Sequence, residues 1–316
     1  MRFISKDDIR DGLDYQSLVD ALGEHHMRDI DDVQSMVLEQ PGSSGEPTHF
    51  LTGPTWQTGQ ALGTKLVTVF PNNEHNGSGL PSVQAVYVLF DGKNGEPLAC
   101  MDGTELTLWK TAADSALGAK YLAPPSPDRL VMVGAGAMAP HLIMAHCAVR
   151  PSIKEVRIWN RSPARAETLA ASMAVNGVSI KASDDLEDAV RNADIISCAT
   201  MATEPMVRGA WLKPGAHLDL VGSYMPNMRE CDDEALRRSS VFVDSPWSAL
   251  KDSGELLQAF ENGTLKPEDI LANNFMLVRG EHPGRTDEAE ITVYKNGGGG
   301  HLDLMVAQIL WAKHSV

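Results

Sequence analysis

The spacing of hydrophobic residues changes from helical to strand-like early in the chain. Leu18, Ala21, Leu22 and His25 lie at helical spacing and predict an amphipathic helix over residues 17–30. Short β-type runs, separated by clusters of Gly, Pro and Asn, follow at residues 33–38, 49–51, 63–70, 84–90 and 97–101. We therefore expect a mostly antiparallel sheet in the first third of the chain.

From residue 124 onward, apolar strand runs alternate with helical periodicity. Helices are expected at residues 140–148, 163–173 and 185–192, between strands at 130–133, 155–159, 178–182, 193–200, 217–222, 241–244 and 290–295. This order predicts a Rossmann-type α/β fold, in which right-handed crossovers connect a doubly wound parallel sheet.

The final helix, expected over residues 301–313, is rich in Leu, Met, Val and Ile and needs an apolar surface to cover. We expect it to return to the first domain, so that the N-terminal segment and this helix together form an α+β domain. The predicted bounds are 1–122 with 293–316 for that domain, and 123–292 for the Rossmann dinucleotide-binding domain.

A G-x-G-x-x-A turn follows the first strand of the α/β region directly. Gly134 allows the tight turn, Gly136 lets the backbone approach a pyrophosphate, and Ala139 lets the next helix pack closely on the strand. Ala137 and Met138 open that helix, whose free N–H groups would hold the phosphates. The turn predicts a dinucleotide site, and the alternative is an ordinary βαβ unit that binds no nucleotide.

The second strand of this unit ends in Asn160, Arg161 and Ser162. A carboxylate at this place would bind the ribose 2′-hydroxyl of NADH, whereas Arg161 and the Ser162 hydroxyl can bind a 2′-phosphate. We therefore favour NADPH as the cofactor, with NADH as the second choice. The alternative interpretation of Arg161 is a solvated charge at a strand end.

Further cofactor contacts are expected where two other parallel strands end. Residues Ala199, Thr200, Gly222 and Ser223 would line the crevice at the carboxyl ends of their strands. Near the C-terminus, four consecutive glycines that include Gly298 precede a helix. They suit a close approach of backbone to ligand, and a plain flexible turn explains them almost as well.

One lysine lies where an apolar residue is expected. In the helix predicted over residues 105–122, Lys110 belongs to the apolar stripe of Leu106, Ala113 and Leu117 and not to the polar face. In one interpretation its alkyl stem packs while the ammonium reaches water. In the other, the ammonium points at a substrate carboxylate inside a cleft.

The composition excludes several classes of protein. The 316-residue chain is 43% hydrophobic and 22% charged, which is ordinary for a globular protein of two domains. Its net charge of −15 leaves no basic face for nucleic acid or anionic lipid. The N-terminal stretch lacks an apolar leader, so we expect a cytoplasmic protein. The spacing of the four cysteines predicts neither a disulfide nor a metal site.

Several blocks of the chain resemble the ornithine cyclodeaminase/μ-crystallin family, in the family's order and over nearly the whole length. These blocks are GTKLVTVFPNN, GLPSVQAVYVLFDGKNGEPLACMDGTELTLWKTAADSALGAKYLA, GAGAMA, ADIISCAT, WLKPGAHLDLVGSYMPNMRECDDEAL and EITVYKNGGGG. The resemblance implies a homodimer, a substrate-binding and dimerisation domain beside the Rossmann domain, and an active site at the domain junction. It also implies a small amino or imino acid as the substrate.

Departures from the family pattern narrow the function. Tyr224 stands where the cyclodeaminases have a catalytic Asp, and Lys110 stands where the family usually has an Arg that holds the substrate carboxylate. The interval between Arg28 and Arg129 contains no arginine, so a further carboxylate-binding arginine is absent too. Lys65 matches the family's substrate lysine. These replacements look more like the ketimine reductases than the cyclodeaminases.

Two classes of function follow from this resemblance. The first is an enzyme that reduces a small cyclic imino acid with NADPH, Δ1-pyrroline-2-carboxylate to proline or Δ1-piperideine-2-carboxylate to pipecolate. Lys65 and Lys110 would bind the carboxylate, and Lys65, a water or, less favoured, Tyr224 would keep the imine protonated. Ornithine cyclodeamination and amino-acid dehydrogenation are the enzymatic alternatives. The second class is a non-enzymatic, crystallin-like protein that binds NADPH.

Overall fold

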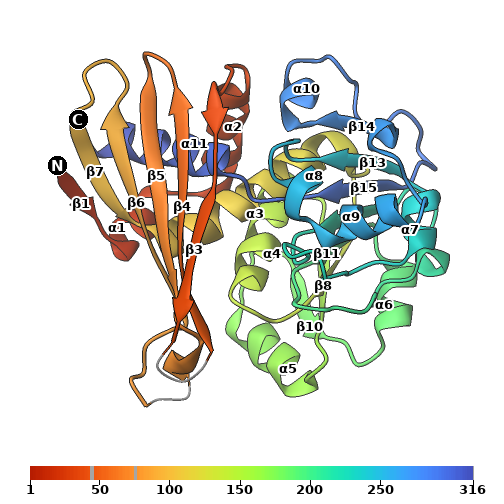
Figure 1. The fold of residues 1–316 in the computed structure, drawn as a ribbon. Helices are drawn as coiled ribbons and strands as arrows, with labels where there is room; N and C mark the ends of the chain where they lie inside the picture. The colour runs from red at the N-terminus through yellow and green to blue at the C-terminus, as the bar shows by residue number, and fades with distance from the viewer. Residues whose placement is uncertain (43–45, 75–76, 316) are drawn as a thin grey trace. The chain divides into compact units, whose positions relative to one another are not determined.

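The computed structural model describes residues 1–42, 46–74 and 77–315, which form two compact units (Figure 1). Unit 1 contains residues 1–21, 28–110 and 299–316, and unit 2 contains residues 22–27 and 111–298. The boundaries therefore differ from the predicted ones at 122/123 and 292/293. Residues 111–122 belong to unit 2 because the second half of their helix packs on its sheet, where Gly118 approaches Tyr294.

Unit 1 is built on a seven-stranded sheet of order β1-β7-β6-β5-β4-β2, with β3 also paired to β4. Its pairs are antiparallel except for the parallel pair of β1 and β7, so the expected antiparallel sheet is confirmed. The strands are β1 (Arg2–Ile4), β2 (Asp32–Val33), β3 (Met36–Pro41), β4 (Pro47–Gln57), β5 (Ala61–Val69), β6 (Val83–Asp91) and β7 (Pro97–Asp102).

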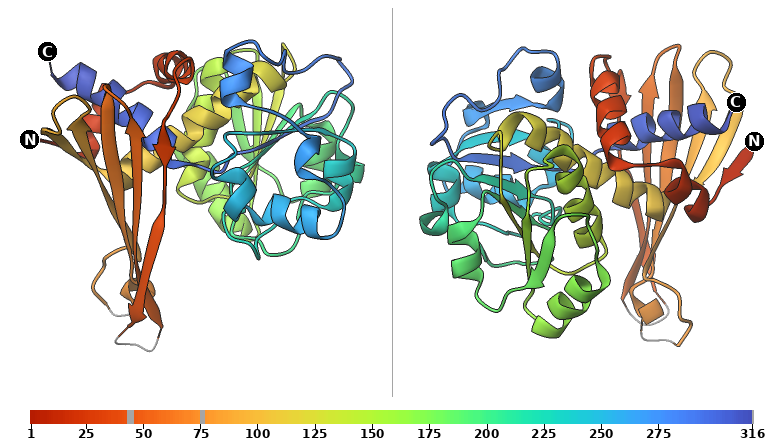
Figure 2. Two further views of the ribbon diagram at one scale, coloured as in Figure 1. Left: turned by 45° about the horizontal axis from the view of Figure 1, so that its top comes forward. Right: turned by 180° about the vertical axis from the view of Figure 1, so that it is seen from behind.

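Helices cover one face of this sheet. The chain enters through α1 (Lys6–Gly12) and α2 (Tyr15–His26), a 3-10 turn η1 (Pro71–Glu74) follows β5, and α11 (Gly300–His314) returns from the far end of the sequence. The last helix lies across β4, β5 and β6, as the rear view in Figure 2 shows. The apolar composition of this helix predicts that it packs on a sheet. The structure confirms this, because Leu302, Leu304 and Met305 are fully buried.

Unit 2 carries an eight-stranded sheet of order β10-β9-β8-β11-β12-β15-β13-β14. All of these pairs are parallel, which confirms the predicted Rossmann-type α/β fold. Its strands are β8 (Arg129–Val133), β9 (Glu155–Trp159), β10 (Ser179–Ala182), β11 (Ile195–Cys198), β12 (His217–Leu220), β13 (Ser240–Val243), β14 (Ile270–Asn273) and β15 (Thr292–Lys295). The strand order reverses between β8 and β11, the point at which such sheets bind a ligand.

Helices cover both faces of the parallel sheet. The helical segments are α3 (Gly103–Leu122), α4 (Met138–Val149), α5 (Pro163–Ser172), α6 (Leu186–Asn192), η2 (Gly209–Trp211), α7 (Asp233–Arg237), α8 (Ala249–Asp252), α9 (Gly254–Glu261), η3 (Pro267–Asp269) and α10 (Asn274–Val278). One core cluster joins α6, α7 and α9 to one face, and a smaller cluster joins Leu122 of α3 and Leu277 of α10 to the other. None of the described helices is long and apolar enough to cross a membrane.

Candidate functional site

The glycine turn of unit 2 has the geometry that its sequence predicts. Gly134 follows β8 with φ +111°, a conformation that favours glycine, and its N–H donates to the carbonyl of Trp159 at 2.8 Å. A Cβ at Gly134 would lie 2.6 Å from the carbonyl oxygen of Ala199, the residue that follows β11. The turn therefore brings the carboxyl ends of β8, β9 and β11 together.

The start of α4 presents free donors beside open space. A Cβ added at Gly136 would meet no atom within 4 Å, so this glycine leaves room that the chain itself does not fill. The N-cap residue Ala137 offers no side-chain cap to the helix, which begins at Met138. Ala139 is fully buried, as close packing of the helix on its strand requires. The turn thus fits a pyrophosphate held by backbone N–H groups.

The three residues predicted to contact the cofactor at the end of β9 have two different roles in the structure. The Asn160 side chain accepts from the N–H of Ala135 at 3.2 Å and donates to the carbonyl of Ser162 at 3.0 Å, so it braces the glycine turn. Arg161 is exposed and forms no ion pair in the part of the chain that the structure describes. Ser162 precedes α5 without capping it through its side chain. The latter two side chains are thus available to an anion.

Glu230, which sequence reasoning missed, ties the next two strand ends together. Its Oε1 accepts from the backbone N–H and the hydroxyl of Thr200, both at 2.8 Å, and its Oε2 accepts from the N–H of Gly222 at 2.7 Å. A Cβ at Gly222 would lie 2.1 Å from the carbonyl oxygen of Thr200. A side chain at position 222 would therefore prevent the segment after β12 from approaching the segment after β11. The hydroxyl of Thr200 is already used within the protein.

Further buried charges surround Glu230. Burial raises its pKa to about 7, against the attraction of the buried Lys295 ammonium and the three hydrogen bonds that it accepts. Glu255 accepts in turn from the N–H groups of Glu230 and Cys231 at 2.8 and 2.9 Å, and Lys295 donates to the carbonyl of Leu220 at 3.1 Å. No local sequence signal marks this cluster, because its members come from four separate segments.

Three other predicted residues lie in the same unit. The hydroxyl of Ser223 is buried and has no hydrogen-bond partner among the described residues, so it remains available to a ligand. Tyr224 is 54% exposed and lies in the loop that follows β12, where its N–H donates to Gly222. Gly298 has φ +64° and donates from its N–H to the side chain of Asn296 at 2.9 Å. The positive φ of the turn is sufficient to explain a glycine at position 298, without a contact to a ligand.

A second group of charged side chains lies in unit 1, between the sheet and α11. The Lys65 ammonium on β5 lies 2.9 Å from Oδ2 of Asp303 on α11. The Lys110 ammonium on α3 lies 3.4 Å from the same oxygen and donates to the carbonyl of Gly299 at 3.1 Å. We call Lys65, Lys110 and Asp303 the lysine cluster. Asp303 was missed from the sequence, although it is the one acidic residue in a strongly apolar helix.

The two lysines differ in their access to ligand. The Lys110 side chain is only 1% exposed, so its ammonium does not reach water as the first interpretation supposed. Its ammonium donates to the carbonyl of Gly299 and to Asp303, and the second interpretation, in which it points at a substrate carboxylate, stays a prediction. The Lys65 side chain is 20% exposed and is the accessible member of the lysine cluster.

Two hydrogen-bonding atoms near the lysine cluster lack partners. Tyr87 lies directly opposite Lys65 in the pairing of β5 and β6, and its side chain packs over Gly63. The Tyr87 hydroxyl and the Asp303 Oδ1 are both buried without a hydrogen-bond partner within residues 1–42, 46–74 and 77–315. Burial and the Asp303 charge raise the Tyr87 pKa well above its ordinary value, so the phenol stays protonated.

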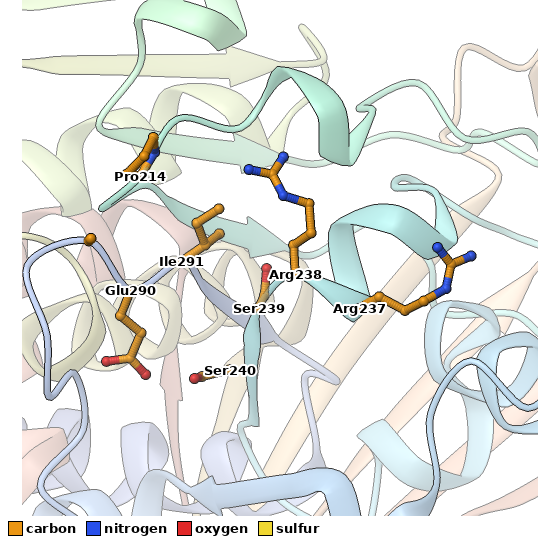
Figure 3. A pocket seen from close by; sticks show the side chains of 8 residues that line it. Pro214, Arg237, Arg238, Ser239, Ser240, Glu290 and Ile291 are labelled. Carbon is orange, nitrogen blue, oxygen red and sulfur yellow. The ribbon is translucent and has the colours of Figure 1, made fainter.

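An open pocket of about 440 Å³ lies elsewhere in unit 2 (Figure 3). Its lining includes Arg238, Ser240 and Ile291, at the amino ends of β13 and β15, opposite to the edge that carries the glycine turn. Arg238 donates to the carbonyl of Leu212 at 3.3 Å and also to that of Gly209. The pocket therefore does not coincide with the predicted cofactor site.

The family model described as the ornithine cyclodeaminase/mu-crystallin family matches residues 11–315 of the chain. The chain belongs to this family. The resemblance inferred from the sequence blocks is thereby confirmed.

The chain is similar in sequence to two reductases of stated activity. The chain is 38% identical over 309 residues to a Delta(1)-pyrroline-2-carboxylate reductase of Paracoccus denitrificans, covering 98% of this chain and 96% of the relative. It is 40% identical over 254 residues to the ketimine reductase mu-crystallin of Rattus norvegicus, covering 79% of this chain and 75% of the relative.

Among solved structures, the chain resembles the Thermococcus litoralis Delta(1)-pyrroline-2-carboxylate reductase in complex with NADH and L-proline. The TM-score is 0.89 at 29% identity, and the match covers 100% of this chain and 99% of the other. This agreement spans both units, so the α/β sheet and the unit that holds the lysine cluster both have counterparts in a solved structure.

Proposed function

We propose that this protein reduces a small cyclic imino acid with a nicotinamide cofactor, Δ1-pyrroline-2-carboxylate to L-proline or Δ1-piperideine-2-carboxylate to L-pipecolate. The observation that carries the proposal is the lysine cluster, in which one ammonium is accessible and a second is held inside the protein. The reductases of Paracoccus denitrificans and Rattus norvegicus support the same assignment by their similarity.

Each unit contributes one half of the chemistry. In unit 1, the Lys65 ammonium binds the substrate carboxylate through charge-assisted hydrogen bonds. In unit 2, Gly134, Gly136 and the start of α4 would hold the pyrophosphate of the cofactor, with Ala199 and Ser223 at neighbouring strand ends. The nicotinamide would supply hydride when bound.

The reduction needs few groups because the substrate carbon is already at the imine oxidation level. Hydride forms the new C–H bond at the C=N carbon, and the π electrons of the C=N bond become the nitrogen lone pair. The iminium proton stays on nitrogen, so the products are the neutral amine and oxidised cofactor. Lys65 or a water keeps the imine protonated before transfer, since an iminium carbon is far more electrophilic. Tyr224, 54% exposed, is the second choice of proton donor.

The cofactor preference that we propose is NADPH over NADH. Arg161 and Ser162 follow β9, where the adenosine ribose lies in such folds. Among the residues that the structure describes, Arg161 forms no ion pair, and the Ser162 side chain does not cap α5. A guanidinium and a hydroxyl bind a 2′-phosphate, whereas NADH offers a neutral hydroxyl there.

We also propose that the protein is a homodimer, formed through the sheet face opposite to α11. Thr55 and Gln57 of β4 are buried beneath that helix, so Trp56 between them points to the other face. Trp56 is 48% exposed and Phe50, on the same face, is 40% exposed. An apolar face of this kind favours a second copy as its partner. Light scattering should give twice the chain mass, and Trp56→Asp should lower it toward the monomer.

Side-by-side assays test the function. We expect NADPH oxidation with Δ1-pyrroline-2-carboxylate or Δ1-piperideine-2-carboxylate to be much faster than ammonia release from L-ornithine with NAD⁺. Ammonia release at an equal or higher rate would replace the proposal with cyclodeamination. Cofactor binding without turnover of any of these substrates would replace it with a binding role.

A further inference from the structure

Three oxygen atoms beneath the first turn of α11 are buried without a hydrogen-bond partner in the described part of the chain. They are the Thr55 hydroxyl on β4, the Tyr87 hydroxyl on β6 and Oδ1 of Asp303 on α11. The three residues are only 2%, 0% and 1% exposed. A buried oxygen that lacks a partner is costly, and folded proteins nearly always supply one. The three atoms therefore need a common explanation.

The register of the sheet brings the two hydroxyls to the lysine cluster. Thr55 lies opposite Gly63 on β5, and the Tyr87 hydroxyl packs over the same glycine, where a Cβ would lie 2.3 Å from it. Tyr87 also lies opposite Lys65, whose ammonium is 2.9 Å from Asp303. Directly opposite residues point to the same face of a sheet. Both hydroxyls therefore lie on the face that α11 covers, beside the Asp303 side chain.

The helix encloses these atoms from the other side. A Cβ at Gly300, the first residue of α11, would lie 2.7 Å from the Thr55 hydroxyl. Asp303 follows three positions later, and residues at this spacing share one face of a helix. Glycine at positions 63 and 300 leaves room for the two hydroxyls, which a methyl group at either position would displace. The three oxygens thus share one enclosed place between sheet and helix.

The chemistry of the three oxygens indicates what they bind. Oδ1 of Asp303 only accepts, whereas each hydroxyl donates one hydrogen and also accepts. A cation is disfavoured, because the Lys65 and Lys110 ammonium groups already lie 2.9 and 3.4 Å from the other oxygen of the carboxylate. An anion is disfavoured by the carboxylate itself. Water is neutral, donates and accepts at once, and forms about three hydrogen bonds when it is buried.

We propose that Thr55, Tyr87 and Asp303 hold one ordered water beneath α11. The two hydroxyls are then positioning residues, which act on Lys65 through the water and the carboxylate. With both of its oxygens engaged, the carboxylate does not rotate, and Oδ2 stays directed at the Lys65 ammonium. The effect on turnover rests on the proposed function, which takes Lys65 as the substrate-binding group. The water site itself does not depend on that function.

A high-resolution crystal structure of the wild-type protein tests the site directly. Density for a water should lie within about 3.2 Å of all three oxygens. A direct hydrogen bond between any two of them, or no water density among them, would overturn the proposal. This experiment needs no variant and no turnover.

Thermal unfolding distinguishes a hydroxyl that binds water from one that is idle. Tyr87→Phe and Thr55→Val each remove one hydroxyl with little change in volume. A hydroxyl bonded to a buried water stabilises the fold, so each variant should lose about 2 °C or more in Tm. Removal of an unpartnered buried hydroxyl would leave Tm unchanged or raise it. That result in both variants would overturn the proposal.

Steady-state kinetics test the positioning role. Tyr87→Phe should raise the KM for the imino acid about tenfold, while the dissociation constant of NADPH stays as in the wild type. Tyr121→Phe, which removes a tyrosine hydroxyl from α3 in unit 2, is the control and should change neither quantity. Tyr87→Phe with an unchanged KM would overturn the positioning role.

A double variant shows whether Tyr87 acts through the carboxylate. In the Asp303→Ala background, Tyr87→Phe should change kcat/KM by no more than about twofold, because the group it acts on is gone. A further tenfold loss there would show that Tyr87 acts by another route. Absence of imino acid reduction, together with the expected water and Tm results, would instead count against the proposed function and leave the water site standing.

Discussion

Asp303 and Glu230 are both buried carboxylates, one in each unit, and they differ in the groups that donate to them. Glu230 accepts on both oxygens from N–H and hydroxyl groups of Thr200 and Gly222, which hold two loops together. Asp303 uses one oxygen for two ammonium groups, and its other oxygen has no partner within the described residues. One carboxylate is therefore satisfied by the fold. The other is shared by two ammonium groups, and the Lys65 ammonium remains accessible.

The comparison shows how a buried carboxylate that stabilises the fold can be distinguished from one that serves a binding site. Both carboxylates are fully enclosed, so burial alone does not distinguish them. The decisive feature is whether a charged partner remains accessible, as Lys65 does at 20% exposure. Disruption of the Glu230 group should affect stability and cofactor binding, and disruption of the lysine cluster should affect substrate binding and turnover.

Lys65→Met is expected to have the largest effect. Without its ammonium the substrate loses its carboxylate anchor and orientation, so kcat/KM should fall by about a thousandfold or more, while NADPH binding is retained. Steady-state kinetics and fluorescence titration with NADPH measure the two quantities. Lys93→Met, in the exposed turn before β7, is the control and should behave like the wild type. A Lys65→Met protein with normal kinetics would remove this residue from the site.

Glu230→Gln should affect stability in a pH-dependent way. The pKa of Glu230 is raised from its ordinary value to about 7, so the folded protein binds a proton that the unfolded chain releases near pH 4.5. The stabilisation is complete below pH 4.5 and is lost as the pH rises through 7, by up to about 3 kcal/mol. Gln cannot titrate, so the excess unfolding free energy of the wild type over Glu230→Gln should shrink between pH 5 and pH 8.

Denaturant unfolding of both proteins at several pH values checks this. The raised pKa arises beside Lys295 and Glu255, which both proteins retain, so their contributions largely cancel in the difference. The variant should also bind NADPH more weakly, because Gln places an amide group opposite the N–H donors of Thr200 or Gly222. A stability difference that stays constant over this range would show that Glu230 does not titrate there.

Arg161→Asp should have an intermediate effect, confined to cofactor choice. Loss of a charge-assisted phosphate contact should weaken NADPH by about tenfold or more and reverse the preference toward NADH. Lys154→Asp makes the same charge change just before the other end of β9 and serves as the control. If the ratio of NADPH to NADH affinity stayed as in the wild type, the 2′-phosphate would bind elsewhere.

Tyr224→Phe should have the smallest effect. The side chain is 54% exposed, and a phenol is a poor base at neutral pH. Since imine reduction needs no base at this position, the variant should keep kcat within about threefold of the wild type. A loss of two orders of magnitude with unchanged KM would identify Tyr224 as the proton donor.

The regular parts of the fold could be predicted from the sequence because their signals are local. The glycine turn and the apolar strands of the β/α region give the parallel sheet, and alternating runs give the sheet of unit 1. Short elements were missed, among them β1, β14 and α7 to α10, because three to eight residues hold too little periodicity. The domain boundary inside α3 was also missed, since a continuous helix carries no signal where its packing partner changes.

The candidate site could be predicted only in part, for the same reason. Lys65 and the residues of the glycine turn belong to recognisable blocks, and Lys110 stood out as a charge in an apolar stripe. Its partner Asp303 lies 193 positions further along the chain, and Glu230 lies 30 positions from Thr200. No spacing rule connects such residues, because the fold alone brings them together.

The return of α11 to unit 1 also has a consequence for biosynthesis. The sheet of unit 1 is complete once residue 102 has left the ribosome, yet the helix that covers it begins at Gly300. During the synthesis of almost two hundred residues, that apolar face lacks α11, and Lys65 and Lys110 lack Asp303. The sheet of unit 2 is also completed late, because β15 lies between β12 and β13 and is among the last segments to be made. The last helix to be made therefore closes the first unit, and the lysine cluster forms only at the end of translation.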